Sequence, residues 1–344
     1  MDQFLEPPRI NDDAQPEITA RMPGFSNRSF IVILTYMRSG SSLTGDILQQ
    51  HPGSFYIFEP LHRTTKVMKE GQPIFMQNGQ ARIYGMEDLK EVSQDIMGSF
   101  SSCHVESLSC TLLGDGLTIG KGHRLANYRE CCRLSDYKLS VCPPAICLQI
   151  LKTDCLDSKY IVIKTIRLPI DGMEELLEKN PNMKIIHLLR DPRATIRSEI
   201  SYGVGKWNDI SNVSMNWCQR VIKDIETFEI FKKKFPNRLF RIRYEDLSRY
   251  PINISRLMYN FAGIQYTDEV RQYVYSRMIQ PNDPSVPGWK GTSTDRMEKW
   301  RKIIAWWAVK TIDTNCQKVY DKVGYRRARD KETLEDLTIS MTID

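Results

Sequence analysis

Residues 29–48 have the sequence SFIVILTYMRSGSSLTGDIL, and this stretch determines which fold we expect for the chain. Residues 29–36 form a continuous run rich in β-branched and aromatic side chains, which is typical of a strand buried inside a parallel sheet. A short polar loop follows at residues 37–41, and the apolar spacing after it predicts a helix over residues 42–50. Because parallel strands need a crossover connection, this pattern indicates the start of a βαβ unit.

The alternation of strand and helix continues along the chain. Further strands are predicted at residues 54–58, 160–166, 183–189 and 239–244. Helical segments are predicted within residues 63–100, 171–179, 193–202, 215–235, 251–262, 267–279 and 296–323. Strands that alternate with helices predict an α/β fold, a P-loop-like parallel sheet flanked by helices.

The sheet domain is expected to span residues 29–326. Residues 1–28 are expected to be an unstructured lead-in, because their beginning is acidic and contains proline, with none of the features of a signal peptide. Residues 327–344 predict a polar C-terminal tail. No window of the sequence reaches the ~18 consecutive apolar residues of a membrane helix.

The nine cysteines are unevenly distributed. Seven lie between residues 103 and 155, in a segment rich in Gly, Ser and Pro that shows little periodicity. This pattern predicts a mostly irregular insertion, over about residues 101–158, that is stapled by disulfides; zinc ligands would occur as paired Cys-x-x-Cys motifs. Cys218 and Cys316 lie on separate predicted helices and are expected to bond to each other. The odd total leaves at least one thiol free or paired outside the chain.

The composition of the chain indicates which kinds of partner and which cellular compartment to expect. The formal net charge is +6, but no block of Lys and Arg is dense enough to indicate a nucleic-acid partner. Asn-x-Ser sequons begin at Asn27, Asn212 and Asn253, and each alone is weak evidence for a glycoprotein. Together with the cysteines, the sequons favour the lumen of the secretory pathway.

Two polar segments follow predicted strands, so they are expected at the carboxyl edge of the sheet, where such folds bind ligands. The first is the loop formed by Arg38, Ser39, Gly40, Ser41 and Ser42. Its glycine, its backbone N–H groups and its arginine suit an anion, whereas the Walker pattern G-x-x-x-x-G-K-[ST] is absent. The alternative is that the serines only cap the helix and that Arg38 is a surface charge.

The second segment is HLLRDPRATIRSEI, at residues 187–200. Arg190 leaves the end of the strand, and Ser198 lies about two turns into the following helix, so the two can grip one phosphate together. Arg193 adds positive charge. The alternative is a helix capped by Asp191 with solvated arginines.

These motifs resemble those of the Golgi carbohydrate sulfotransferases, specifically the group that modifies the 6-O position of galactose, N-acetylglucosamine and N-acetylgalactosamine. The loop from Arg38 to Ser42, with Leu43 after it, resembles the 5′-phosphosulfate loop of that family. Arg190 through Arg193 to Ser198 resembles its 3′-phosphate segment. The resemblance implies the sulfuryl donor 3′-phosphoadenylyl sulfate, no metal, a glycan or glycosaminoglycan acceptor and a location in the Golgi lumen. It also implies a membrane anchor, for which this sequence has no apolar segment.

The segment Phe58-Glu59-Pro60-Leu61 also resembles that family, and sulfuryl transfer to a neutral hydroxyl benefits from a base. Glu59 is the candidate, because it ends the second predicted strand beside the loop. The alternative is that Glu59 is a solvated carboxylate or a partner of Arg38. His62 is the rival base, although its position favours a structural histidine over a base.

Further residues are assigned to binding. Lys164 and Arg167 bracket the end of the third predicted strand, where they can hold an acidic or sulfated sugar, or the sulfuryl donor. Residues 288–301 form a loop rich in Gly, Ser and Thr that is expected to cover the adenosine and its 3′-phosphate. Ser293 and Arg296 are its candidate contacts.

Two rival functions remain open. A P-loop phosphotransferase would need a Lys-Ser/Thr pair in the loop, which the sequence lacks. A non-catalytic glycan or anion binder would keep the same fold, and nothing in the sequence excludes it.

Overall fold

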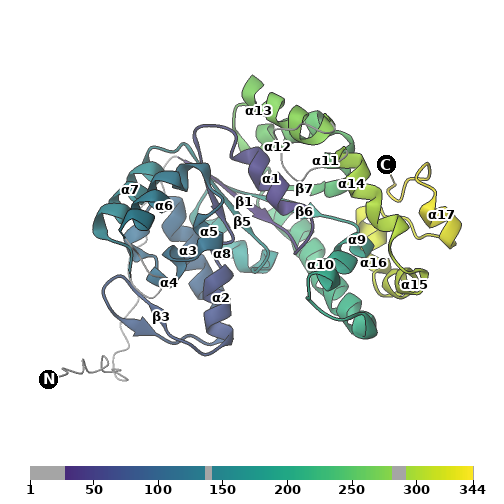
Figure 1. Cartoon of the computed structure of the whole chain (residues 1–344), viewed down its shortest axis with the longest axis horizontal. Coiled ribbons are helices and arrows are strands. Elements are labelled where there is room, and N and C mark those ends of the chain that lie inside the picture. Colours follow the sequence, from purple (N-terminus) through teal and green to yellow (C-terminus); the bar gives the residue numbers. More distant parts are fainter. Residues whose placement is uncertain (1–27, 136–141, 281–291, 344) are drawn as a thin grey trace.

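A five-stranded parallel sheet forms the centre of the molecule (Figure 1). The structure is a computed structural model that describes residues 28–135, 142–280 and 292–343. The strands of this sheet are β1 (Ser29–Leu34), β2 (Ser54–Phe58), β5 (Tyr160–Thr165), β6 (Met183–Leu189) and β7 (Leu239–Arg243). Every strand predicted from the sequence is present, and the predicted α/β fold is confirmed.

The strand order is β2-β5-β1-β6-β7, which places β1 in the middle of the sheet. Its side chains alternate between two cores: Val32 and Leu34 belong to one, Ile31 and Ile33 to the other. Because both faces of the strand are buried, all of these positions are apolar, as the continuous apolar run indicated. In the parallel register, Ile33 lies opposite Lys164 of β5.

Helices cover both faces of the sheet (Figure 1). The core on one face includes side chains of α1 (Ser41–Leu48), α12 (Pro251–Ala262) and α13 (Asp268–Val274). The core on the other face includes side chains of α3 (Leu89–Ser102), α7 (Ala145–Leu156) and α8 (Glu174–Lys179). A third cluster joins α9 (Pro192–Ser201), α10 (Ile210–Lys234), α15 (Trp306–Asn315) and α16 (Gln317–Val323). These helices agree with most of the predicted helical segments.

The segment between residues 63 and 100 is less helical than predicted. It contains α2 (His62–Lys69), then the antiparallel hairpin of β3 (Ile74–Phe75) and β4 (Ala81–Arg82), and then α3. Gly71 and Gly79 both have positive φ, at 61° and 81°, and so allow the chain to leave α2 and to turn between the two strands. The Asn78-Gly79 pair is a hairpin signal that the amphipathic pattern of the segment obscured.

The cysteine-rich insertion is stapled as predicted, but it is helical rather than irregular. It contains the short helices α4 (Cys110–Leu113), α5 (Gly116–Ile119) and α6 (Ala126–Leu134) together with α7. Disulfides join Cys103 to Cys155, Cys110 to Cys142 and Cys131 to Cys147. Cys132 is buried and free. The short helices lacked a clear period in the sequence because each makes only one to three turns, too few to show one.

The C-terminal part is divided into more helices than predicted. Besides α15 and α16, it contains α14 (Ser293–Glu298) and α17 (Lys331–Glu335), and α11 (Tyr244–Arg249) directly follows β7. The segment after residue 326 packs on the body of the protein: Leu334 and Met341 are buried, and Arg243 Nη1 donates to the carbonyl of Ile343 at 2.8 Å. Within the described ranges, no helix has the length and apolar character needed to cross a bilayer.

The predicted disulfide between Cys218 and Cys316 is present and joins α10 to the end of α15, across a sequence separation of 98. Replacing both cysteines by serine should lower the free energy of unfolding by about 4–5 kcal/mol, because the unfolded chain regains the freedom of a long loop. Removing the pair Cys131–Cys147, with a separation of 16, should cost about 3 kcal/mol. Urea denaturation of both double variants tests this order, and a larger loss for the shorter loop would contradict it.

Candidate active site

The loop between β1 and α1 has an unusual backbone. Arg38 and Gly40 both have left-handed conformations, with φ of 61° and 88°. A Cβ atom on residue 40 would lie 2.2 Å from Cδ2 of Tyr244, so only glycine fits there. Gly40 is also the N-cap of α1 and has no side chain to bond the first N–H groups of that helix. The loop therefore leaves the positive end of α1 open to an anion.

The two predicted anion segments meet. Arg38 Nε donates to Ser198 Oγ at 3.0 Å, and Arg190 Nη1 donates to the carbonyl of Arg38 at 3.0 Å. The Arg38 guanidinium also lies 3.8 Å from the centre of the Tyr202 ring. The prediction that Arg38, Arg190 and Ser198 lie in one place thus agrees with the geometry.

Tyr244 also lies at this anion site, although the sequence pattern did not predict it. It begins α11, closes over Gly40, and its ring centre lies 4.5 Å from the Arg190 guanidinium. In the sequence it ends an apolar and basic strand, where an aromatic residue is usually part of the core. Only its contacts reveal that it lies between the two anion segments.

Ser293 and Arg296 lie on α14, and residues 281–291 before them are outside the described part of the chain. Ser293 is buried, and its hydroxyl donates to the carbonyl of Ser248 at 2.7 Å. This bond gives Ser293 a structural role in joining α14 to α11. Burial lowers the pKa of Arg296, and its Nη2 atom donates to the carbonyl of Arg277 at 3.3 Å.

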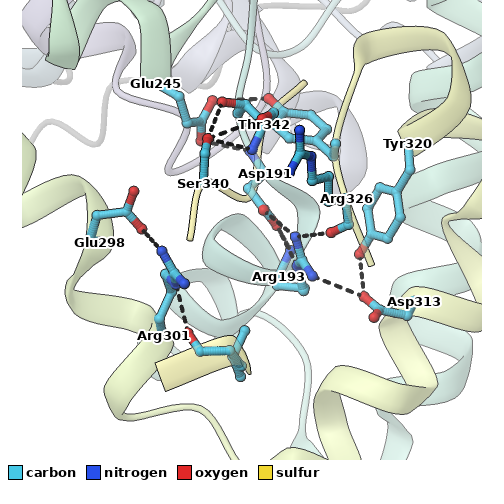
Figure 2. A network of polar contacts seen from close by, with 12 residues as sticks. Asp191, Arg193, Glu245, Glu298, Arg301, Asp313, Tyr320, Arg326, Ser340 and Thr342 are labelled. Atoms are coloured by element: carbon cyan, nitrogen blue, oxygen red, sulfur yellow. Dashed lines mark hydrogen bonds and ion pairs between the residues drawn. The ribbon is translucent and has the colours of Figure 1, made fainter. Parts of the chain in front are cut away.

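Arg193 does not join the anion site (Figure 2). It is fully buried and pairs with both carboxylate oxygens of Asp191, at 3.0 and 2.7 Å. It also donates to the carbonyl of Arg326 at 2.9 Å and lies 3.5 Å from Asp313. At about 100° per residue, Arg193 and Ser198 differ by about 140° around α9, so they cannot face the same ligand.

Glu59 lies at the end of β2, where the sequence placed it, but its partners differ from those expected. It has a left-handed backbone, with φ of 51°, and is 2% exposed. Lys164 Nζ lies 2.5 Å from Oε1, and Arg167 Nη1 forms an ion pair with Oε2. Burial lowers the pKa of Lys164, and the charge of Glu59 opposes this. Glu59 is therefore neither solvated nor a partner of Arg38.

A basic cavity opens beside this ion pair. It has a volume of about 320 Å³ and is lined by His62, Thr65, Lys66, Lys69, Glu70 and Arg167. His62 begins α2, and its Nδ1 atom lies 3.1 Å from Asp115 Oδ2 in the insertion. The cavity can receive a ligand with a negative group. Among the described residues, no three His, Cys, Asp or Glu side chains gather as a metal site would require.

Comparisons with known proteins identify the family to which the chain is similar. A family model described as "Sulfotransferase family" matches residues 30–268. Human carbohydrate sulfotransferase 1 is 27% identical over 350 residues, which cover 92% of this chain and 84% of that protein. Mouse carbohydrate sulfotransferase 3 is 24% identical over 375 residues, covering 98% and 76%. Among solved structures, the sulfotransferase domain from the curacin biosynthetic pathway covers 88% of this chain and 99% of that domain, with a TM-score of 0.47 and 18% identity.

Glu245 supports the turn that carries Arg190. Its carboxylate accepts hydrogen bonds from the backbone N–H of Asp191 and the hydroxyl of Tyr325, each at 3.0 Å (Figure 2). Burial, with the charge of Asp191, raises the pKa of Glu245 to about 7. A carboxyl that holds its proton more tightly in the folded state contributes stability at low pH, and that stability is lost as the pH rises towards the folded pKa.

Replacement of Glu245 by glutamine should therefore flatten the pH dependence of stability. We expect the free energy of unfolding of the wild type to fall, relative to Glu245→Gln, by on the order of 2–3 kcal/mol between pH 4.5 and pH 7. Urea denaturation at several pH values measures the difference. Parallel curves for the two proteins would contradict the assignment.

Arg193 should contribute to stability because its removal leaves the buried carboxylates of Asp191 and Asp313 without their cation. We expect Arg193→Met to lose about 3–5 kcal/mol of unfolding free energy. Arg197→Met, on the same helix but half-buried, is the control and should change stability by about 1 kcal/mol or less. Equal losses for the two variants in urea denaturation would refute the structural role of Arg193.

Proposed function

The chain belongs to the sulfotransferase family, and we propose that it transfers a sulfuryl group from 3′-phosphoadenylyl sulfate to a sugar hydroxyl in a glycan. The acceptor position we propose is the 6-O of N-acetylglucosamine, galactose or N-acetylgalactosamine. The observation that carries the proposal is the meeting of Arg38, Arg190 and Ser198 at the open end of α1. The sulfuryl donor has phosphate groups at its 5′ and 3′ positions, and each of them needs its own hydrogen-bond donors.

The polar groups of the site suit this sulfuryl donor. Arg190 Nε and Ser39 Oγ are buried and have no hydrogen-bond partner among the described residues. Buried polar groups in proteins are normally paired, so unpaired ones beside an anion loop favour a ligand that completes them. We assign the 5′-phosphosulfate to the loop from Arg38 to Leu43, and the 3′-phosphate to Arg190 and Ser198. We also assign Arg296, on α14, to the binding of this sulfuryl donor.

Catalysis by this arrangement rests on position and charge. In sulfuryl transfer, as in phosphoryl transfer, the acceptor oxygen attacks in line while the leaving phosphate oxygen gains negative charge. Arg38 and the N–H groups at the start of α1 are fixed before the reaction, so they stabilise that charge without reorganisation. The ion pairs of Glu59 hold Lys164 and Arg167 at the neighbouring strand end, beside the acceptor cavity.

The cavity favours an acidic glycan. Lys66, Lys69 and Arg167 line it together with a single carboxylate, that of Glu70. A sulfated or carboxylated sugar next to the acceptor residue would neutralise this charge. The similarity to carbohydrate sulfotransferases 1 and 3 supports a glycan acceptor.

The four disulfides favour an oxidising compartment, and we propose the lumen of the secretory pathway, specifically the Golgi. Two sequon asparagines, Asn212 and Asn253, are exposed on helices, whereas Asn27 lies outside the described residues. Exposure is a condition for glycosylation, so these two sites remain available for the proposed glycoprotein.

Replacement of Arg38 tests the proposed function. Arg38→Met should weaken the binding of adenosine 3′,5′-bisphosphate at least ~10-fold by calorimetry, because hydrogen bonds to charged groups contribute about 1.5–3 kcal/mol. It should also reduce the transfer of labelled sulfate to desulfated glycosaminoglycans and to oligosaccharides ending in galactose or N-acetylglucosamine. Arg329→Met, on an exposed arginine of the C-terminal segment, is the matched control.

A wild-type protein that binds the bisphosphate but transfers sulfate to no glycan in the array would favour the alternative of a non-catalytic binder. Normal binding by Arg38→Met would show that the loop is not the anion site.

A further inference from the structure

The disulfide-stapled insertion reaches into the candidate active site. Asp115 is the N-cap of the short helix α5, and Thr118 lies within that helix. Asp115 contacts the start of α2, and Thr118 contacts the residue that follows β2. Asp115 Oδ2 lies 3.1 Å from Nδ1 of His62. Thr118 Oγ1 donates to Asp115 Oδ2 at 2.7 Å or to the carbonyl of Glu59 at 3.0 Å. The insertion thus contacts both residues that the sequence offered as bases.

Asp115 determines which nitrogen of His62 is free. An ionised carboxylate only accepts hydrogen bonds, so Nδ1 of His62 must carry the hydrogen in this contact. In the neutral imidazole, Nε2 is then left with its lone pair and can accept a proton. His62 has 32% of its side chain exposed and lines the basic cavity. A hydroxyl in that cavity can therefore meet a proton acceptor.

Glu59 is placed less well for this task. Each of its oxygens is in an ion pair, one with Lys164 and the other with Arg167. With 2% exposure, its carboxylate is enclosed by those partners, and an acceptor hydroxyl would have to displace one of them. A general base must come within hydrogen-bond reach of the proton that it removes. The geometry favours His62 over Glu59.

We propose that His62 is the general base of the transfer reaction and that Asp115, supplied by the insertion, is its positioning residue. The proposal rests on the proposed function. The acceptor oxygen forms a bond to sulfur as the bond from sulfur to the 5′-phosphate oxygen breaks, and the electron pair of that bond leaves with the bisphosphate. The acceptor proton moves to His62 Nε2 and is later released to water.

Charged groups from three elements surround His62. Asp115 faces it from the insertion, and Arg167 from the segment after β5. Lys66 and Glu70 follow on α2 at one and two turns, and Lys69 lines the same cavity. Asp115 is the acidic group in direct contact with the His62 ring.

The first test removes the base. His62→Asn should lower kcat about 100-fold or more, since general-base catalysis contributes about 10²–10⁴-fold. Its affinity for adenosine 3′,5′-bisphosphate should remain that of the wild type, which shows that the fold and the sulfuryl-donor site are intact. His104→Asn is the control: His104 lies at the edge of the same insertion, contacts Ser102, and does not line the cavity.

The second test removes the positioning charge but keeps the fold. Asp115 caps α5, its Oδ1 accepting from the N–H of Leu117 at 3.4 Å, and asparagine caps helices equally well. Asp115→Asn should lower kcat about 10-fold or more. Asp115→Glu should restore part of the lost kcat, because a longer carboxylate can still accept a hydrogen bond from His62 Nδ1. KM for the acceptor should stay within about twofold of the wild type in both variants, whereas loss of a purely structural residue would change KM and kcat together.

Two results would overturn the proposal. One is a kcat for His62→Asn within about threefold of the wild type, with Glu59→Gln alone inactive; this would make Glu59 the base. The other is a kcat for Asp115→Asn within about twofold of the wild type. A failure of the proposed function is distinguishable, because then the wild type itself would transfer no sulfate.

Discussion

The carboxylate of Glu59 is the junction on which the candidate active site depends. Buried charge is costly unless it is paired, and Glu59 meets this condition by binding Lys164 and Arg167 at the end of β5. Its carbonyl oxygen accepts a hydrogen bond from the backbone N–H of His62 at 2.9 Å and lies 3.0 Å from the hydroxyl of Thr118. One residue therefore joins two strands, the first turn of α2 and the insertion. Its strained left-handed backbone is held by all of these contacts.

The parallel sheet places the two halves of the site side by side. Because β1 lies between β5 and β6, the loop at Arg38 has the acidic junction on one side and the Arg190 segment on the other. The half near β6 contains the Arg190 segment that we assign to a phosphate, and the half near β5 lies beside the basic cavity that we assign to the acceptor. Arg38, Glu59 and Arg190 each follow the end of a buried strand of this sheet.

Much of the fold and part of the site could be predicted because they depend on local pattern. Buried parallel strands appear as apolar runs, and Arg38, Arg190 and Ser198 follow strand ends whose positions those runs define. Arg193 could not be placed, because the rotation around α9 that turns it into the core is invisible without the neighbouring helices. Asp115 could not be found either: its contact with His62 joins residues 53 positions apart on elements too short to show a period.

The turn that bears Arg190 is stabilised by residues that come much later in the sequence. The carboxylate of Glu245 accepts hydrogen bonds from the N–H of Asp191 in this turn and from the hydroxyl of Tyr325. The carbonyl of Arg326 accepts a hydrogen bond from Arg193 (Figure 2). Domains grow from the N-terminus during synthesis. A nascent chain can thus complete every strand of the sheet by residue 243 and still lack these hydrogen bonds. The turn that bears Arg190 therefore gains its full set of hydrogen bonds only after residues 325 and 326 have been made.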